Sequence, residues 1–344
     1  MLLSPFKHVE LVVAGLTLVC VGCLPTDTRP PPASVFVEAS SDEAVRSGFS
    51  TDDGWTISFT RFLITLGRTS LDGDSCNPYA EAGYERVLDM QQPSPQKVSL
   101  LYGLGQCDFS FGVVHPVSDS VIGPGVTSQE AQMMQTAGSD KYTAPTQQFS
   151  GVNTYVTGVA DRGGERKIFA WSFRQDYEYQ SCSIATDAGP EQGLNLRGKE
   201  SNSVDLLIRG EALFQTDVDS SRAKLHFDPL AMADSIFGNN DGQVTLDELG
   251  LIPILVTGSQ GVGTPFDAGS LSLGGLDAGS FTGRFDGGIE ALDGSTSDYV
   301  ASDGGLTSLG TLEDFVYLAL FPTIVRYRDT GRCSSVIART GRRR

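Results

Sequence analysis

The sequence predicts a mainly β fold: an antiparallel β-sandwich or barrel-like core with a small C-terminal helical segment. Two observations support this prediction. Before Gly210, short runs rich in β-branched and aromatic residues recur, and Asp-Gly or Gly-Gly turn signals separate them. After Gly210 the strand pattern gives way to short segments with helical signals.

The clearest strand candidate is 55–66, which is rich in β-branched and aromatic residues. Its apolar residues alternate from Trp55 to Phe59 and then change phase near Arg61, which predicts a β-bulge. Further strands are expected at 34–38, 98–102, 109–114, 149–159, 167–173 and 203–209.

The N-terminus predicts export and a lipid anchor. Residues 1–22 read as a signal peptide, because the apolar stretch from Leu11 to Val21 is shorter than the roughly 20 residues of a spanning helix. Gly22-Cys23 resembles the end of a lipobox, in which the cysteine is lipidated, although Cys20 stands where Leu or Val is usual. Plain secretion and an uncleaved anchor are the alternatives. The expected location is the bacterial cell envelope, periplasmic or at the cell surface.

The rest of the chain is expected to consist of a tether and one domain. Residues 23–33 are Pro-rich and extended, which holds a domain away from its anchor. Residues 34–344 then form a single β-rich domain. It includes an EF-hand-like segment at 228–250 and a Gly/Ser/Asp-rich excursion at 258–310.

The charge of the chain excludes one class of partner. The formal net charge is −17, whereas binding to nucleic acid requires clustered Lys and Arg. Arg339 and 342–344 form the one basic cluster, expected to be a solvated tail, with a polyanion contact as the alternative. The partners expected are therefore the membrane, through the anchor, and an unknown protein or glycan ligand.

Four cysteines remain after the lipobox, and an even number in an exported chain predicts two disulfides. Three pairings are possible. We favour Cys76–Cys107, which closes a local loop, and Cys182–Cys333, which ties the C-terminal region to the middle of the chain. A four-thiolate zinc site is the rival, but the sequence has no CxxC pair.

Short helices are expected at 228–233 and 245–249, on either side of the strongest chemical motif in the chain. A third follows Thr311-Leu-Glu-Asp314, which fits a capping box. Pro322 should kink or split that helix, because proline lacks the amide hydrogen that a helix interior uses.

The motif is Asn239-Asn-Asp241-Gly242-Gln-Val-Thr-Leu-Asp-Glu248, which matches the latter part of an EF-hand loop. Calcium takes six to eight oxygen ligands, and carboxylates and amides at alternate positions supply them. Asn239, Asp241 and Glu248 would bind through side chains and Gln243 through its backbone carbonyl. One Ca²⁺ ion is therefore the expected cofactor.

The loop has a defect at its first ligand position, which falls on Phe237 when counted back from Gly242. An insertion of three residues would let Asp234 take this position; otherwise a backbone carbonyl or water replaces it. The alternative to calcium is a plain Asx-Gly turn before a capped helix. A defective loop is expected to bind in the weak range, about 10⁻⁴–10⁻³ M.

No catalytic residue is identified. His115 and His226 are the histidines of the mature chain, too few for an ordinary catalytic zinc site, although a shared metal site is an alternative. Acidic pairs such as Asp52-Asp53 suit a glycosidase in type but lie in turn contexts. A hydrolase of glycans or esters thus remains a rival without assigned residues.

Several scattered segments carry a resemblance. They are 53–55 with Phe59 and 62–64, 169–173 with Tyr179 and Cys182, 210–214, 233–249, and 323–333. Together they resemble a group of uncharacterised bacterial lipoproteins. Members of that group carry histidines where this chain has Arg209, Ala212 and Arg326, so a transition-metal site, if the group has one, is expected to be lost here. The resemblance implies an envelope location, a β-rich architecture and calcium rather than a reaction.

These expectations combine into a lipid-anchored extracytoplasmic binding or structural protein that a calcium ion stabilises. An enzyme is the less favoured reading. The two rivals are the hydrolase and a metal-handling lipoprotein that uses His115 and His226.

Overall fold

The computed structural model describes residues 30–81, 84–135, 151–187, 189–218, 223–253 and 310–338. The expected signal peptide, Cys23, nearly all of the tether and the 258–310 excursion, except Gly310, lie outside these ranges. The chain divides into two compact units, Met1–Pro31 and Pro32–Arg344, and the fold below is that of the second unit.

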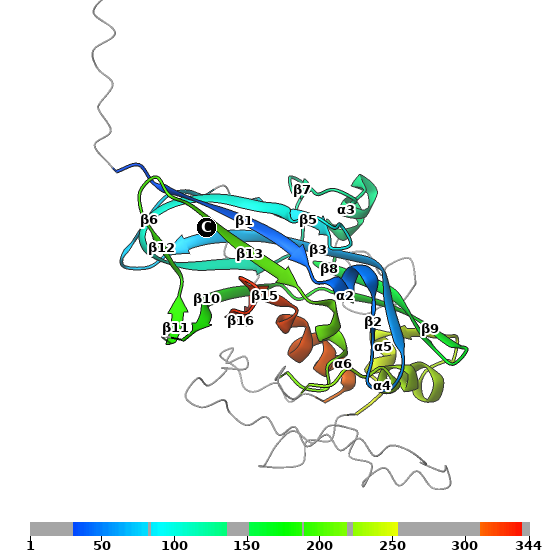
Figure 1. Cartoon of the computed structure of the whole chain (residues 1–344). Coiled ribbons are helices and arrows are strands. Elements are labelled where there is room, and N and C mark those ends of the chain that lie inside the picture. The colour runs from blue at the N-terminus through cyan, green and yellow to red at the C-terminus, as the bar shows by residue number, and fades with distance from the viewer. Residues whose placement is uncertain are drawn as a thin grey trace, which may run out of the picture. The chain divides into compact units, whose positions relative to one another are not determined.

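The second unit is built on one curled, mixed β-sheet (Figure 1). Its central strands, in spatial order, are β14 (Gln243–Thr245), β9 (Glu165–Phe173), β8 (Thr154–Arg162), β3 (Thr56–Asp72), β6 (Gln96–Val113), β1 (Ala33–Ser41), β13 (Ser201–Ile208) and β15 (Val325–Tyr327). The remaining strands are β2 (Phe49–Ser50), β4 (Cys76–Glu81), β5 (Arg86–Asp89), β7 (Val121–Ile122), β10 (Tyr177–Thr186), β11 (Gly189–Gln192), β12 (Leu194–Leu196) and β16 (Arg332–Ile337). The predicted mainly β class is confirmed.

Most neighbouring strands are antiparallel, as predicted, and three pairs are parallel: β1 with β13, β5 with β7, and β14 with β9. The predicted bulge is present, because the register of β3 against β8 shifts between Phe59 and Arg61. The two strands expected at 98–102 and 109–114 are parts of one long strand, β6, which continues through residues 103–108.

The helical elements are short. They are α2 (Glu43–Ser47), α3 (Ser128–Gln135), η2 (Gly210–Phe214), α4 (Asp228–Met232), η3 (Ala233–Phe237), α5 (Leu246–Leu249), α6 (Leu312–Asp314), η4 (Phe315–Leu320) and η5 (Phe321–Thr323). The capping box at Thr311 and Asp314 is present, and Pro322 lies in the 3₁₀ turn η5, where the preceding helix ends. The predicted C-terminal helical segment is therefore confirmed.

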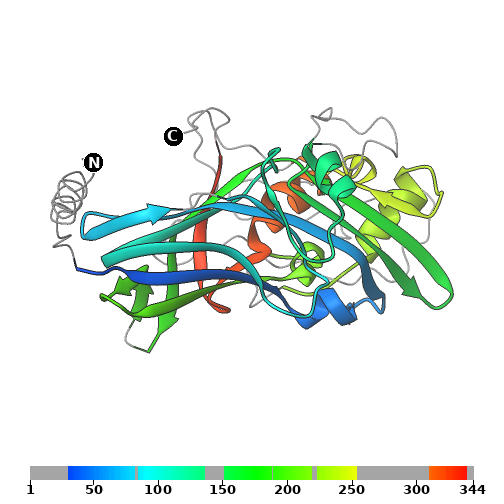
Figure 2. The same ribbon diagram turned by 90° about the horizontal axis from the view of Figure 1, so that it is seen from above.

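An aromatic cluster joins the helical segment to the sheet. The Phe169 ring from β9 contacts Trp171 and, from η2, Phe214, at centroid distances of 5.1 and 5.5 Å. At the end of β9, the ring of Phe173 stacks on the ring of Phe321 in η5 at a centroid distance of 4.0 Å. Figure 2 shows the C-terminal helical turns, in orange, among the green strands of the sheet. Buried aromatic rings supply large apolar area, and this cluster therefore gives the short helices a rigid support.

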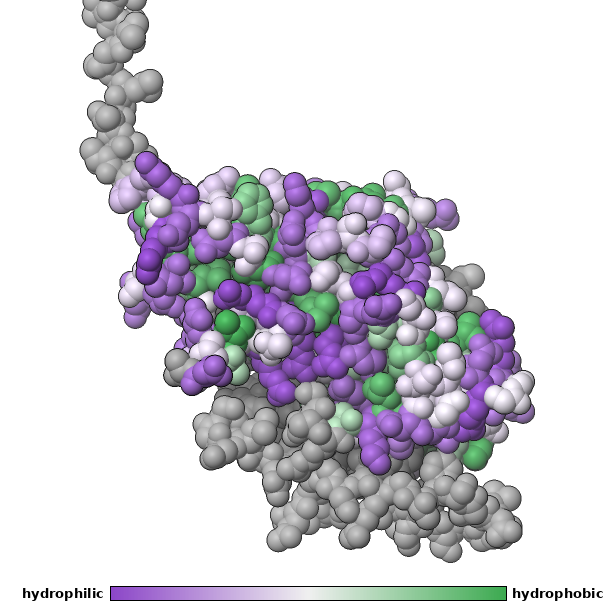
Figure 3. All heavy atoms as spheres, in the orientation of Figure 1, coloured by the Kyte–Doolittle hydropathy of each residue, from purple (hydrophilic) through white to green (hydrophobic). Residues whose placement is uncertain are grey.

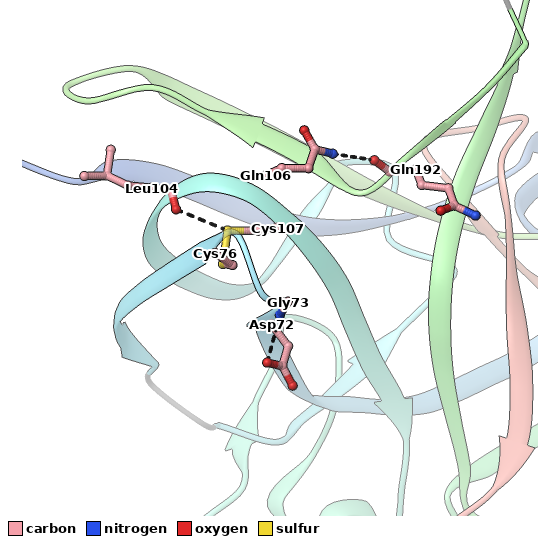
Figure 4. Close-up of a disulfide and its surroundings, with 7 residues drawn as sticks. All are labelled: Asp72, Gly73, Cys76, Leu104, Gln106, Cys107 and Gln192. Carbon is pink, nitrogen blue, oxygen red and sulfur yellow. Dashed lines mark hydrogen bonds between the residues drawn. A yellow bond between two sulfur atoms is a disulfide. The ribbon is translucent and has the colours of Figure 1, made fainter.

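Both predicted disulfides are present. Cys76–Cys107 joins β4 to β6 (Figure 4), and Cys182–Cys333 joins β10 to β16. Cys182 lies where the register of β10 against β16 shifts, between Gln180 and Ser183. Disulfides of this kind are typical of chains that fold in an oxidising compartment.

The surface is mainly polar on the face seen in Figure 3, with apolar side chains scattered over it. Among the described residues, the large apolar side chains that are exposed come from several different elements, for example Phe36 in β1, Ile168 in β9 and Ile236 in η3. Singly exposed apolar residues are ordinary for a folded domain.

Candidate metal centre

The segment that carries the predicted calcium motif is fixed to the sheet at its start. Oδ2 of Asp53, in the turn before β3, accepts hydrogen bonds from the backbone N–H groups of Phe227 and Asp228, both at 2.7 Å. The indole N–H of Trp55 donates to Oδ1 of Asp228 at 2.9 Å. The two bonds to Asp53 satisfy backbone donors at the N-terminus of α4, which a helix leaves without intrahelical partners.

A wide helical turn then places Asp234. Helix α4 continues directly into η3, a π-helical turn over Ala233–Phe237 that ends at Gly238. A π turn accommodates extra residues within a helix and often occurs at functional sites. The π-helical turn therefore contains the residues between Asp234 and the loop, which is where the sequence predicted a three-residue insertion.

Asp234 is completely buried. Its Oδ2 accepts from the ammonium of Lys167 in β9 at 2.6 Å and from the N–H of Gly242 at 3.2 Å. Its Oδ1 is buried without any hydrogen-bond partner. An unsatisfied buried carboxylate oxygen is costly, so this oxygen is available to a ligand.

The loop after η3 is held by its own polar side chains. Oδ1 of Asn239 accepts from the N–H of Asp241 at 2.9 Å, and its Nδ2 donates to Oδ2 of Asp241 at 3.1 Å. Oδ1 of Asp241 accepts from the N–H of Gln243 at 2.8 Å. Gly242 has a φ of +86°, a left-handed conformation that glycine adopts without steric cost.

Glu248 closes the site from α5. Its Oε2 accepts from both the N–H and the hydroxyl of Thr245 at 3.0 Å, which completes a capping box. Its Oε1 lies 3.4 Å from the N–H of Asn239. A side chain at Gly238 would collide with Oε1 of Glu248, so glycine allows this close approach.

Three carboxylates therefore converge. Asp234, Asp241 and Glu248 each offer an oxygen, and these three oxygens lie within 4.8 Å of one another. With the ammonium of Lys167 bonded to Asp234, the cluster has a formal charge of −2. Such a group can hold a metal ion, because oxygen ligands at this spacing and a matching opposite charge are what hard cations require.

The other two predicted ligands have different positions. Asn239 lies beside the cluster, but its side chain is bonded to Asp241. Gln243 begins β14, which pairs in parallel with β9. Of the five predicted ligands, the structure brings together Asp234, Asp241 and Glu248, whereas Asn239 lies in the adjoining loop and Gln243 lies at the start of β14.

Lys167 was not predicted. It alternates with Phe169 and Trp171 on β9, and all three side chains are buried. A charged residue in phase with the apolar residues of a strand requires a buried partner of opposite charge. That phase relationship was the signal in the sequence.

The histidines do not form a metal cluster with these residues. Nδ1 of His115 lies 2.6 Å from Oδ1 of Asp176, and its Nε2 lies 2.8 Å from the carbonyl oxygen of Gly151. In the described part of the chain, neither His115 nor His226 belongs to a group of three or more converging His, Cys, Asp or Glu ligands. The four cysteines are bonded in pairs, so the four-thiolate zinc alternative is wrong.

An acidic pair outside the cluster of three carboxylates joins Asp42, the N-cap of α2, to Glu211 in η2. Burial, followed by the hydrogen bond and charge of Glu211, raises the pKa of Asp42 to about 8. The other carboxyl, Glu211, is paired with Arg209, whose Nε donates to Oε1 at 2.7 Å. Asp42 also accepts from the N–H of Val45 as the N-cap of α2. Each carboxyl group thus has at least one structural partner, and, unlike Asp234, neither belongs to a group of three converging ligands among the described residues.

The segment that carries the three carboxylates also contacts the C-terminal helical turns. Pro253 forms a β-bridge with Thr311. The N–H of Leu312 donates to the carbonyl oxygen of Ile252 at 2.9 Å. Helices α5 and α6, on either side of this junction, pack against each other.

Comparisons of the chain with protein-family models, curated proteins and solved structures found no match. Among the described residues, no helix is both long enough and apolar enough to cross a membrane.

Proposed function

We propose that the protein is a lipid-anchored, extracytoplasmic binding or structural protein in which one calcium ion stabilises the segment after Gly210. The observation that carries this proposal is the convergence of Asp234, Asp241 and Glu248, with a buried oxygen of Asp234 that has no partner. The ammonium of Lys167 satisfies one oxygen of Asp234, and a bound cation would satisfy the other, which is buried without a partner.

Calcium fits this donor set better than zinc or magnesium. All three residues offer oxygen, whereas structural zinc sites favour cysteine and histidine. Magnesium demands a near-ideal octahedron, while calcium tolerates an irregular loop. Glu248 would bind the ion with its carboxylate. Asp241 is exposed to solvent, which leaves room for water ligands. Asn239 and the carbonyl of Gln243 are near enough in sequence to complete the coordination shell.

The ion would act as a clamp. Its ligands come from η3, from the loop and from α5, and Lys167 links the same cluster to β9. The indole N–H of Trp171, also in β9, donates to the carbonyl of Val244 at 3.0 Å, within β14. A cation here would therefore stiffen both the edge of the sheet and the junction at which Pro253 pairs with Thr311.

The proposed location follows from the N-terminus. Cys23 would carry the lipid, and the Pro-rich tether would separate the domain from the membrane. The two disulfides and the acidic composition are consistent with an exported domain that meets a protein or glycan ligand, and not nucleic acid. The resemblance to bacterial lipoproteins supports the same proposal.

Calorimetric titration of the chelator-treated chain with CaCl₂ tests the proposal. We expect one site with a dissociation constant of about 10⁻⁴–10⁻³ M. At an ion concentration tenfold to a hundredfold above that constant, linkage predicts a stabilisation of about 1.4–2.7 kcal/mol. The absence of binding heat, together with a melting curve that chelator leaves unchanged, would contradict it.

A further inference from the structure

Lys167 is a charged side chain in an apolar setting. It lies on the buried side of β9, its side chain is only 7% exposed, and it alternates with Phe169 and Trp171. Its ammonium is paired with Asp234, whose side chain has no exposed area. A buried ammonium is retained only at a considerable desolvation cost, so its presence beside three carboxylates calls for a function.

The two oxygens of Asp234 have separate roles. Oδ2 is occupied by Lys167 and by the N–H of Gly242. Oδ1 is buried and unpartnered, and it is therefore the oxygen left for an ion. A bound ion and the ammonium would thus sit on the same carboxylate without displacing each other.

We infer that Lys167 is a specificity-determining residue that sets the formal charge of the site to −2 and thereby favours divalent over trivalent cations. This inference rests on the proposed metal site and deepens it. Three carboxylates without the ammonium would carry −3, which matches a trivalent ion such as Tb³⁺. With Lys167 present, a divalent ion neutralises the site completely, whereas a trivalent ion leaves an uncompensated positive charge.

The affinity for a single ion cannot isolate the effect of the Lys167 charge. Removing Lys167 takes away a repulsive charge, which tightens binding, but it also takes away a group that orients Asp234, which weakens binding. The orienting contribution is nearly the same for two ions of similar size, such as Ca²⁺ and Tb³⁺. The ratio of the Tb³⁺ and Ca²⁺ affinities therefore depends mainly on the formal charge of the site.

The experiment measures Ca²⁺ and Tb³⁺ binding by equilibrium dialysis on the wild-type chain and on Lys167→Gln and Lys167→Met. Gln keeps a hydrogen-bond donor, and Met keeps the length of the apolar stem. Because one unit charge is removed from the carboxylate that binds the ion, the Tb³⁺/Ca²⁺ affinity ratio should rise by about tenfold or more in both variants.

Two controls accompany these variants. Arg166→Gln removes the same charge from the neighbouring residue of β9, whose side chain is 65% exposed, and the ratio should not change. Lys167→Arg keeps the charge, and the ratio should stay at the wild-type value.

The outcomes separate the inference from the proposed function. A wild-type chain that binds neither ion overturns both. A chain that binds both ions, with the same ratio in wild type, Lys167→Gln and Lys167→Met, overturns the inference and leaves the calcium site in place. If the two neutral variants fold only with Tb³⁺ present, the inference is supported; if they fail to fold even then, Lys167 is a structural residue and the inference is wrong.

Discussion

The ammonium nitrogen of Lys167 lies 2.6 Å from Oδ2 of Asp234, and this buried ion pair joins the edge of the sheet to the turn that carries the candidate metal ligands. The pair links β9 to η3, two elements far apart in sequence. Because both groups are buried away from water, each charge is compensated by the other and not by solvent. The position of Asp234 is therefore set by the sheet as well as by its own loop.

Removing one partner of this ion pair should destabilise the protein far more than replacing both partners with apolar residues. Asp234→Leu leaves the ammonium of Lys167 buried without a partner, and we expect a loss of about 3–5 kcal/mol of unfolding free energy. The double variant Lys167→Met/Asp234→Leu replaces both charges with apolar groups and should lose much less. Urea unfolding with chelator present measures both. Equal losses in the single and double variants would show that the ion pair does not hold the segment.

Glu248→Gln should separate metal binding from helix capping. Glutamine at this position preserves the capping box with Thr245, so stability in chelator should stay within about 0.5 kcal/mol of the wild type. Calcium affinity should fall at least about tenfold, because one of three ligand charges is lost. Asp247→Asn, a neighbouring exposed carboxylate outside the cluster, is the matched control and should bind calcium as the wild type does. Unchanged affinity in Glu248→Gln would remove Glu248 from the ligand set.

The acidic pair at α2 should make stability depend on pH. Burial, and then the hydrogen bond and charge of Glu211, raise the pKa of Asp42 from 3.8 to about 8, so the folded protein holds this proton more tightly than the unfolded chain does. Stability from this group is complete below about pH 3.8 and is lost as pH rises toward 8. Glu211 shifts the other way: burial raises its pKa, but its bond to Asp42 and the charge of Arg209 lower it overall.

Asp42→Asn tests this dependence between pH 5 and 8, above the range in which Glu211 titrates. Asparagine can still cap α2 through Val45 and donate to Glu211. We expect the variant to lose less stability than the wild type as pH rises through this window, measured by thermal melting in chelator. Parallel pH profiles for the two proteins would show that the pKa of Asp42 is not raised in the folded protein.

His115 should hold its proton more tightly in the folded protein than in the unfolded chain. Its two ring nitrogens face pure acceptors, the carboxylate of Asp176 and the carbonyl of Gly151, so both must carry hydrogen. Burial lowers the pKa of His115, but the bond and charge of Asp176 outweigh this effect, and the net pKa lies above 6.5. The contribution to stability is therefore complete below pH 6.5 and is lost as pH rises through the folded pKa.

An NMR titration of the imidazole measures this pKa directly, with His115→Gln used to assign the signal. In the Asp42→Asn background, His115→Gln should also flatten the remaining pH dependence of stability above pH 6.5. A titration midpoint at or below 6.5 would show that the imidazole is neutral and that one of the two contacts is not a hydrogen bond.

Much of the fold was predictable where a local pattern dictates the structure. The alternation of apolar residues predicted the strand that begins at Thr56, and the change of phase near Arg61 predicted its bulge. The capping box at Thr311 and Asp314 was also visible, since its hydrogen bonds are local in sequence. The favoured cysteine pairs were correct, although the sequence alone left three pairings open.

Other features depend on contacts between distant segments. Strand β6 continues past Gly103 and Gly105 because β4 and β12 pair with it there, and such pairing overrides local preference. The site was only partly predictable for the same reason. Asp241 and Glu248 belong to a local motif, whereas the ion pair with Lys167 depends on where β9 passes the loop.

A crystal structure grown with calcium and examined by anomalous scattering tests the central claim most directly. The predicted result is one anomalous peak 2.3–2.6 Å from oxygens of Asp234, Asp241 and Glu248, with the ammonium of Lys167 still on Oδ2 of Asp234. A well-ordered loop with no peak among these three carboxylates at millimolar calcium would contradict it.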